Sequence, residues 1–161
     1  MKIKGQSIKP PKDVVVVIPR DGESIVFRAK AVLDQTPFDA ICPEPQVPRK
    51  KSYGAKADLP AEPFPEEPNY VKALGEYHKH LQDWIFMESL SATEGLEWET
   101  VKPDQPDTWG NWQTELKAAG FSQLEIMRIF QAIIDANGLN QSRIDEATKS
   151  FLAGQDLPDQ L

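Results

Sequence analysis

The chain has 161 residues, about one domain's length, and it is rich in proline, with 14 prolines against 9 glycines. Its formal net charge of −7 is uneven, since residues 1–60 hold 11 basic and 7 acidic side chains and the remainder holds 7 and 18. The acidic part argues against a nucleic-acid ligand, the single cysteine excludes an intrachain disulfide, and no apolar run approaches the roughly 20 residues that span a bilayer.

Residues 1–11 are expected to form an extended arm without a signal peptide, because lysines and prolines stand where an apolar core would be needed. A β-branched run from Val14 to Ile18 follows, and Asp21-Gly22 separates it from a second apolar run within residues 24–33. This order predicts a β-hairpin. The valines continue without strict alternation, which indicates burial on both faces or pairing with something further. A lone hairpin is marginally stable, so it must pack on helices, more strands or a partner.

The single cysteine, Cys42, lies in an apolar setting after a short helical turn that is expected to follow Pro37. We interpret Cys42 as a small buried side chain. A catalytic thiol needs a neighbouring histidine, and nothing in the sequence places one beside Cys42.

Seven prolines punctuate residues 43–68, and such a composition favours an extended chain without a core of its own. We interpret this segment as a linker or long surface loop, with a peptide ligand for a partner's groove as the alternative. Its basic cluster, Arg49-Lys50-Lys51, is typical of a solvated loop rather than of a nucleic-acid site.

Helical spacing of apolar residues predicts a long helix over residues 69–90. His78 and His80 are two positions apart, so they point to different faces of this helix and cannot share a metal ion there. Beyond the helix, three glutamates near Trp98 raise the question of glycosidase chemistry. Nothing separates their environments, and we interpret them as a solvated acidic face: Glu94, Glu97 and Glu99.

Three further helices are expected between Asp107 and Gly154. The first ends before Gly120, the second begins at a capping box over Ser122–Glu125, and the third begins at Gln141 or Ser142. Helices this short are expected to bury their stripes against one another. The third would turn four residues inward: Ile144, Ala147, Phe151 and Leu152.

The sequence thus predicts an α+β fold with an N-terminal β-hairpin, a proline-rich connector and a C-terminal bundle of about four helices. The expected regions are a hairpin region at 1–42, a proline-rich linker at 43–68 and a helical domain at 69–161.

Several blocks together resemble the small tail assembly chaperone proteins of tailed bacteriophages. The hairpin of the type Val-Val-Val-Ile-Pro-Arg contributes, and the other blocks are Ser89–Val101, Trp112–Ser122, Glu125-Ile126, Asn137–Leu139 and Phe151–Gln155. The likeness is one of pattern and order across most of the chain, and its motifs are structural.

The resemblance implies a binding protein of the infected host's cytoplasm, with no cofactor or metal and no nucleic-acid or membrane ligand. Such proteins coat the long, apolar, helical tape measure protein while tail tube subunits polymerise around it. The implied partners are therefore the tape measure protein and the tail tube protein, with possible self-association. Tryptophans at helical spacing are usually core, but tryptophan is also enriched at interfaces, so four of them are candidate contacts by their chemistry: Trp84, Trp98, Trp109 and Trp112.

Two alternatives remain. One is a structural virion protein, a tail or head–tail component, that locks onto its neighbours through the hairpin and the proline-rich arm. The other is an enzyme, which the sequence disfavours because it shows no nucleophile–base pair, metal spacing or glycine-rich phosphate loop.

Overall fold

The computed structural model describes residues 2–3, 5–7, 10–51, 60–138 and 141–155, and these form an α+β fold, as predicted. Parts of the expected N-terminal arm, residues 52–59 of the expected linker and Leu139 lie outside the described residues. None of the described helices combines the length and the apolar character that crossing a membrane requires.

The chain divides into two compact units. The first, here called the hairpin unit, comprises Met1–Val32, Glu88–Leu96 and Gly120–Leu161, and the second, the aromatic unit, comprises Leu33–Met87 and Glu97–Ala119. This division differs from the three consecutive regions expected from the sequence. Each unit combines segments that are distant along the chain, which local sequence patterns do not reveal.

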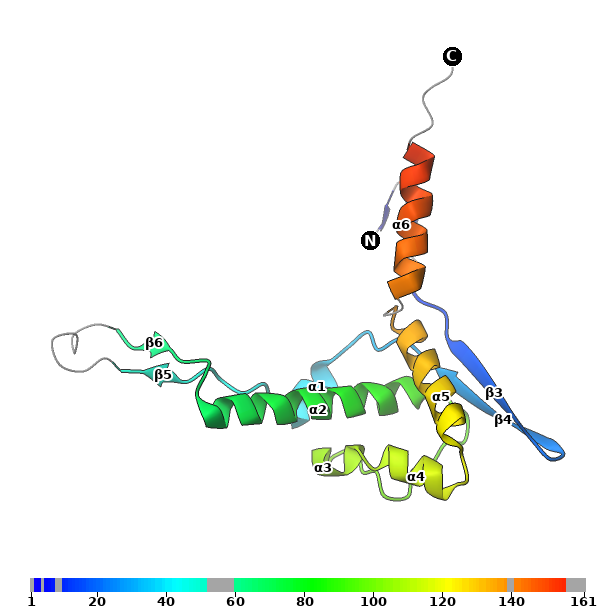
Figure 1. The fold of residues 1–161 in the computed structure, drawn as a ribbon, viewed down its shortest axis with the longest axis horizontal. Coiled ribbons are helices and arrows are strands. Elements are labelled where there is room, and N and C mark those ends of the chain that lie inside the picture. Colours follow the sequence, from blue (N-terminus) through cyan, green and yellow to red (C-terminus); the bar gives the residue numbers. More distant parts are fainter. Residues whose placement is uncertain (1, 4, 8–9, 52–59, 139–140, 156–161) are drawn as a thin grey trace, which may run out of the picture. The chain divides into compact units, whose positions relative to one another are not determined.

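The hairpin unit contains the predicted hairpin. Strands β3 (Val14–Arg20) and β4 (Glu23–Ala29) pair antiparallel, with Arg20 opposite Glu23 across the two-residue turn (Figure 1). Gly22 in that turn has a φ of +86°, a left-handed conformation that glycine adopts without steric cost. A second, very short antiparallel pair, β1 (Lys2–Ile3) with β2 (Gln6–Ser7), lies in the segment expected to be an extended arm.

Helix α5 (Gln123–Ala136) packs on the β3–β4 hairpin and forms the core of the unit with it. Side chains from one face of the hairpin and one face of α5 are buried, and they are mostly aliphatic: Ile18, Phe27, Ala29, Ile126, Ile129, Ala132, Ile133 and Ala136. The capping box predicted at the start of α5 is present, since Ser122 Oγ accepts from the Glu125 N–H at 3.3 Å and Glu125 Oε2 accepts from the Ser122 N–H at 2.7 Å.

Helix α6 (Gln141–Gln155) follows α5 in the same unit and begins and ends near its predicted bounds. None of its described side chains is buried. The prediction that its stripe faces inward is therefore wrong. The stretch expected to be one three-helix scaffold is divided between the two units after Ala119.

The aromatic unit contains α1 (Thr36–Ile41), α2 (Pro68–Leu90, of which residues up to Met87 belong to this unit), α3 (Pro106–Trp109) and α4 (Trp112–Ala118). The helix expected over residues 107–119 is interrupted at Gly110-Asn111, giving α3 and α4. Phe38 of α1 lies at the centre of an aromatic cluster, with ring centroids 5.4 Å from Tyr77, 5.6 Å from Trp84 and 5.9 Å from Trp109.

The proline-rich segment also belongs to the aromatic unit. It forms a short antiparallel pair, β5 (Arg49–Lys50) with β6 (Glu62–Pro63), on either side of the residues that are not described. Lys50 Nζ lies 5.2 Å from the centroid of the Phe64 ring, a cation–π contact. The basic cluster is exposed, in agreement with its interpretation as a solvated loop.

Candidate functional site

Three of the four tryptophans nominated as partner contacts belong to the core of the aromatic unit. Trp84, Trp109 and Trp112 are buried. Trp109 Nε1 donates to the Lys102 carbonyl at 2.9 Å, and Trp112 Nε1 donates to Asp83 Oδ1 at 2.9 Å. Their prediction as contacts conflicts with this burial, because a ring enclosed on its own unit offers no surface to a partner. Trp98 is half-buried and retains some open surface.

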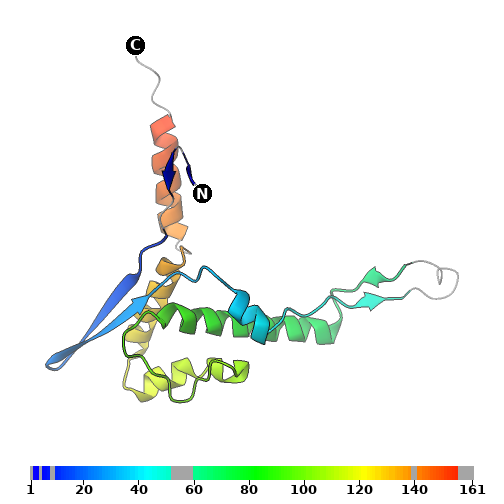
Figure 2. The same ribbon diagram turned by 180° about the vertical axis from the view of Figure 1, so that it is seen from behind.

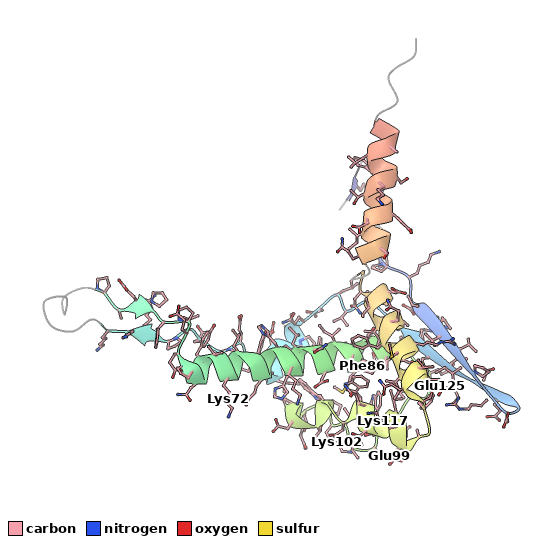
Figure 3. The ribbon with its side chains drawn as sticks, in the orientation of Figure 1. Lys72, Phe86, Glu99, Lys102, Lys117 and Glu125 are labelled. Atoms are coloured by element: carbon pink, nitrogen blue, oxygen red, sulfur yellow. The ribbon has the colours of Figure 1, made fainter. Side chains whose placement is uncertain are left out.

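Asp83 occupies its place because Gly110 lacks a side chain. A Cβ at Gly110 would lie 3.2 Å from Asp83 Oδ2. The carboxylate therefore approaches the backbone closely while it accepts the hydrogen bond from Trp112 Nε1. The ring of Trp112 stacks on that of Phe86, with centroids 3.5 Å apart. Phe86 is labelled in Figure 3. Tryptophan spacing alone could not separate this packing role from a contact role.

The structure brings together a thiol, an imidazole and a carboxylate that the sequence did not connect. Cys42 Sγ lies 3.8 Å from His80 Nδ1, and His80 Nε2 lies 3.5 Å from Asp107 Oδ1. This order matches a nucleophile, a base and a residue that orients the base. No sequence pattern indicated this neighbour, because α1 carries Cys42 to a turn of α2 that is 38 residues away.

The environment of this group favours packing over catalysis. Burial raises the pKa of the Cys42 thiol, whereas a nucleophilic cysteine needs a lowered pKa. The Asp107 side chain is 99% exposed, so water screens its interaction with His80. Within the described ranges, no three His, Cys, Asp or Glu side chains are grouped so that they could hold a metal ion.

The glutamates considered for acid–base chemistry are exposed: Glu94, Glu97 and Glu99. The partner of this loop is the half-buried Glu115, which accepts hydrogen bonds from the backbone N–H groups of Glu99, Thr100 and Val101. Burial raises the pKa of Glu115, but the hydrogen bonds from the Thr100 side chain and from these backbone groups outweigh burial and lower it. Glu115 is therefore ionised, and its carboxylate holds the loop in place through these hydrogen bonds.

Helix α6 carries three exposed apolar side chains. Ile144 is 46% exposed, Phe151 62% and Leu152 52%. Spacings of seven and eight residues place all three on one side of the helix, and we call them the α6 stripe. An isolated helix of 15 residues is only marginally stable in water, so a stripe of this kind is stabilised when it packs on another surface.

A hollow of about 640 Å³ adjoins the α6 stripe within the hairpin unit. Its wall is formed by residues 11–14, by the end of α5 at residues 135–138, and by Ile144 and Ala147 of α6. The volume falls in the range of sites that enclose a small ligand or a large side chain. Ile144 belongs to both the hollow and the stripe, so the two adjoin one another.

The outer face of the β3–β4 hairpin is a second exposed apolar surface. Val15, Val17 and Val26 are each about half exposed and point away from α5, and we call them the valine face. The unbroken valine run in the sequence was the signal for this surface, since it makes both faces of the strand apolar. The tryptophan-based prediction of contact residues missed it.

Comparisons of the chain with protein-family models, with curated proteins and with solved structures find no match. Function is therefore inferred from two features of the described residues. The first is a set of exposed apolar surfaces on an acidic chain, and the second is a thiol–imidazole contact whose thiol has a raised pKa.

Proposed function

We propose that the protein is a tail assembly chaperone of a tailed bacteriophage that binds an apolar helical segment of the tape measure protein in the host cytoplasm. The single observation that carries the proposal is the α6 stripe, an apolar helix face that none of the described elements of its unit buries. Its role is binding rather than catalysis. The resemblance described above supplies the identity of the partner, and the stripe supplies the mode of binding.

Binding through the α6 stripe follows the physics of helix pairing. An amphipathic helix lays its apolar side chains, repeated at about one or two turns, against the apolar face of a partner. The hollow beside Ile144 provides a place for a large apolar side chain of that partner. A tape measure helix that is apolar along its length would gain the same protection from water as the α6 stripe.

The charge of the chain fits a protein that keeps another one soluble. The acidic excess lies after residue 60, where 18 acidic side chains outnumber 7 basic ones, and like charges on the free surfaces of bound copies repel one another. A coat of such proteins would hinder the association of the apolar tape measure chains that they cover.

The second candidate function, a structural virion protein, has the valine face in its favour. A sheet face with three half-exposed valines is a suitable contact for a permanent neighbour in a particle. Mass spectrometry of purified particles separates the two functions, because a structural protein is found in the particle and a displaced chaperone is missing from it.

The proposed function is tested by co-expressing the chain with the tape measure protein and measuring the soluble, co-purifying fraction of the latter. We expect the unmodified chain to retain tape measure protein and Phe151→Asp to lose most of it, because a charge interrupts the α6 stripe. Ser150→Asp is the matched control, since it adds the same side chain at an exposed neighbouring position outside the stripe. Equal retention by Phe151→Asp and the control would overturn the proposal.

A further inference from the structure

The outer edge of β3 is a second interaction surface, separate from the α6 stripe. We infer that β3 pairs antiparallel with β3 of a second copy of the chain, which joins the two hairpins into one four-stranded sheet. The inference does not depend on the proposed function. It rests on which backbone groups of the hairpin are already hydrogen-bonded and which are not.

The direction of the backbone groups follows from Arg28 on β4. The Arg28 N–H donates to Thr93 Oγ1 at 2.9 Å, and the Arg28 carbonyl accepts from the same hydroxyl at 3.1 Å. Both groups thus point away from β3. Val15 lies opposite Arg28 in the register, so its N–H and C=O must point away from β4. The alternation along a strand gives Val17 the same outward direction.

The two edges of the hairpin differ. Besides the Thr93 bonds at Arg28, the β4 edge is covered at Lys30, whose N–H donates to the Ser89 carbonyl at 2.9 Å and whose carbonyl accepts from Ser89 Oγ at 2.6 Å. On the β3 edge, no residue in the described part of the chain bonds to the outward N–H of Val15 or Val17. Figure 2 shows β3 and β4, from the back, as the two strands of the hairpin.

An open edge of this composition is a template for another strand. Natural edges are commonly protected by charged side chains, bulges or proline, yet Val14 to Ile18 contains none of these and is entirely β-branched. Pro19 removes one donor, but only next to the turn. The unpaired stretch of the edge is therefore apolar and five residues long.

A second copy of β3 is the strand that fits this edge. When two copies pair antiparallel about Val16, all five residues from Val14 to Ile18 face the same five apolar residues of the other copy. Val15 and Val17 then exchange both backbone hydrogen bonds across the axis. The resulting contact is two-fold symmetric and uses the same edge on both copies, so it closes as a dimer. The Thr93 and Ser89 bonds cover part of the β4 edge and oppose further growth of the sheet.

The test is designed around the outward N–H of Val17. Val17→Pro deletes this N–H and places a ring where the second strand would approach, but it leaves the β3–β4 bonds intact because Val17 does not donate to β4. The chain already carries Pro19 at an equivalent outward position, opposite Ser24. Val17→Ala is the matched control, because it shortens the side chain and keeps the N–H.

Sedimentation equilibrium over about 1 to 500 µM covers the affinity range expected of a small interface. We expect the unmodified chain and Val17→Ala to approach twice 18.1 kDa, and Val17→Pro to remain at 18.1 kDa with an unchanged circular dichroism spectrum. A single-chain mass for the unmodified protein throughout, or a dimer of Val17→Pro, would overturn the inference.

A second measurement keeps the inference open to refutation if Val17→Pro does not fold. Hydrogen exchange of the unmodified chain is followed at low and high concentration. We expect the amides of Val15 and Val17 to exchange more slowly at high concentration, whereas the exposed amide of Val26 on β4 stays fast. If concentration changes the exchange of neither Val15 nor Val17, the β3 edge is not the dimer contact.

Discussion

Helices α5 and α6 are adjacent in the chain, belong to the same unit and have nearly equal lengths of 14 and 15 residues. Both carry an apolar stripe at helical spacing. α5 buries five side chains, whereas α6 buries none of those that are described. The difference teaches that a stripe in a sequence shows that a helix face is apolar, but not whether the same chain supplies the surface that covers it.

The ends of the two helices differ in the same way. α5 starts at a capping box whose Glu125, labelled in Figure 3, is also paired with Arg20 of β3. It is followed by Asn137, whose side chain accepts a hydrogen bond from the Val32 N–H. The side-chain hydrogen bonds described for α6 join Gln141 to Asp145 and Thr148 to Ile144, both within the helix. Side-chain interactions therefore join both ends of α5 to other parts of its unit, whereas those described for α6 lie within the helix.

The largest expected effect comes from the same substitution in the two helices. Ile129→Ala removes a fully buried side chain, and we expect it to lower the free energy of unfolding by about 2 to 5 kcal/mol. Ile144→Ala alters a half-exposed side chain and should cost no more than about 0.5 kcal/mol. Urea denaturation measures both. Equal losses would show that α6 packs as tightly as α5, and the contrast between the helices would fail.

A smaller effect is expected at the end of α5. Asn137 Oδ1 accepts from the Val32 N–H at 2.9 Å, and Nδ2 donates to the Ile133 carbonyl at 2.8 Å. Asn137→Ala leaves the part-buried Val32 N–H without this acceptor, so we expect a loss of about 1 to 3 kcal/mol in the free energy of unfolding. Gln141→Ala at the start of α6 is the control, with a loss within about 0.5 kcal/mol. If Gln141→Ala lowers the free energy of unfolding more than Asn137→Ala does, the hydrogen bonds of Asn137 do not stabilise the unit as expected.

The smallest effect is a pH dependence at the start of α5. The hydrogen bond from Arg20, with further bonds from Ser122, lowers the pKa of Glu125 from 4.5 to about 2. A carboxyl with a lowered folded-state pKa stabilises the fold above its unfolded pKa, and this stabilisation is lost as the pH falls from about 4.5 to about 2. We expect Glu125→Gln to reduce the fall in Tm over this window.

Arg20→Gln serves as the second variant, because Arg20 makes the largest contribution to the lowered pKa of Glu125. It should also weaken the dependence of Tm on pH, though less than Glu125→Gln, since the Ser122 bonds remain. If Glu125→Gln retains the full dependence of the unmodified chain, the acid sensitivity of the hairpin unit originates elsewhere.

The parts of the fold that sequence could predict are those with local signals. Asp21-Gly22 between two apolar runs identified the β3–β4 hairpin, and Ser122 with Glu125 identified the start of α5. The break between α3 and α4 was missed because Gly110 serves a contact with Asp83 rather than a local turn signal. Sequence patterns within one segment predict the secondary structure of that segment, but they do not identify the segment that packs against it.

The candidate site was harder to predict for the same reason. Trp109 and Trp112 have chemistry that suits a core and an interface equally well, and only their packing showed which applies. The contact of Cys42 with His80 and the pairing of Arg20 with Glu125 join residues 38 and 105 positions apart. No spacing rule links such pairs. The cover on the β4 edge likewise depends on where Thr93 and Ser89 lie.

The discontinuous hairpin unit has a consequence for the time at which the protein folds during its synthesis. Val32 and its partner Asn137 are 105 residues apart, so the hairpin leaves the ribosome well before the helix that covers it is made. At about 5 to 20 residues per second, this interval is roughly 5 to 20 s. During that time α5 does not yet cover the apolar side chains of β3 and β4. Neighbouring nascent chains on the same messenger RNA therefore expose these side chains close to one another. Crowded translation is thus the stage at which premature strand pairing is most favoured.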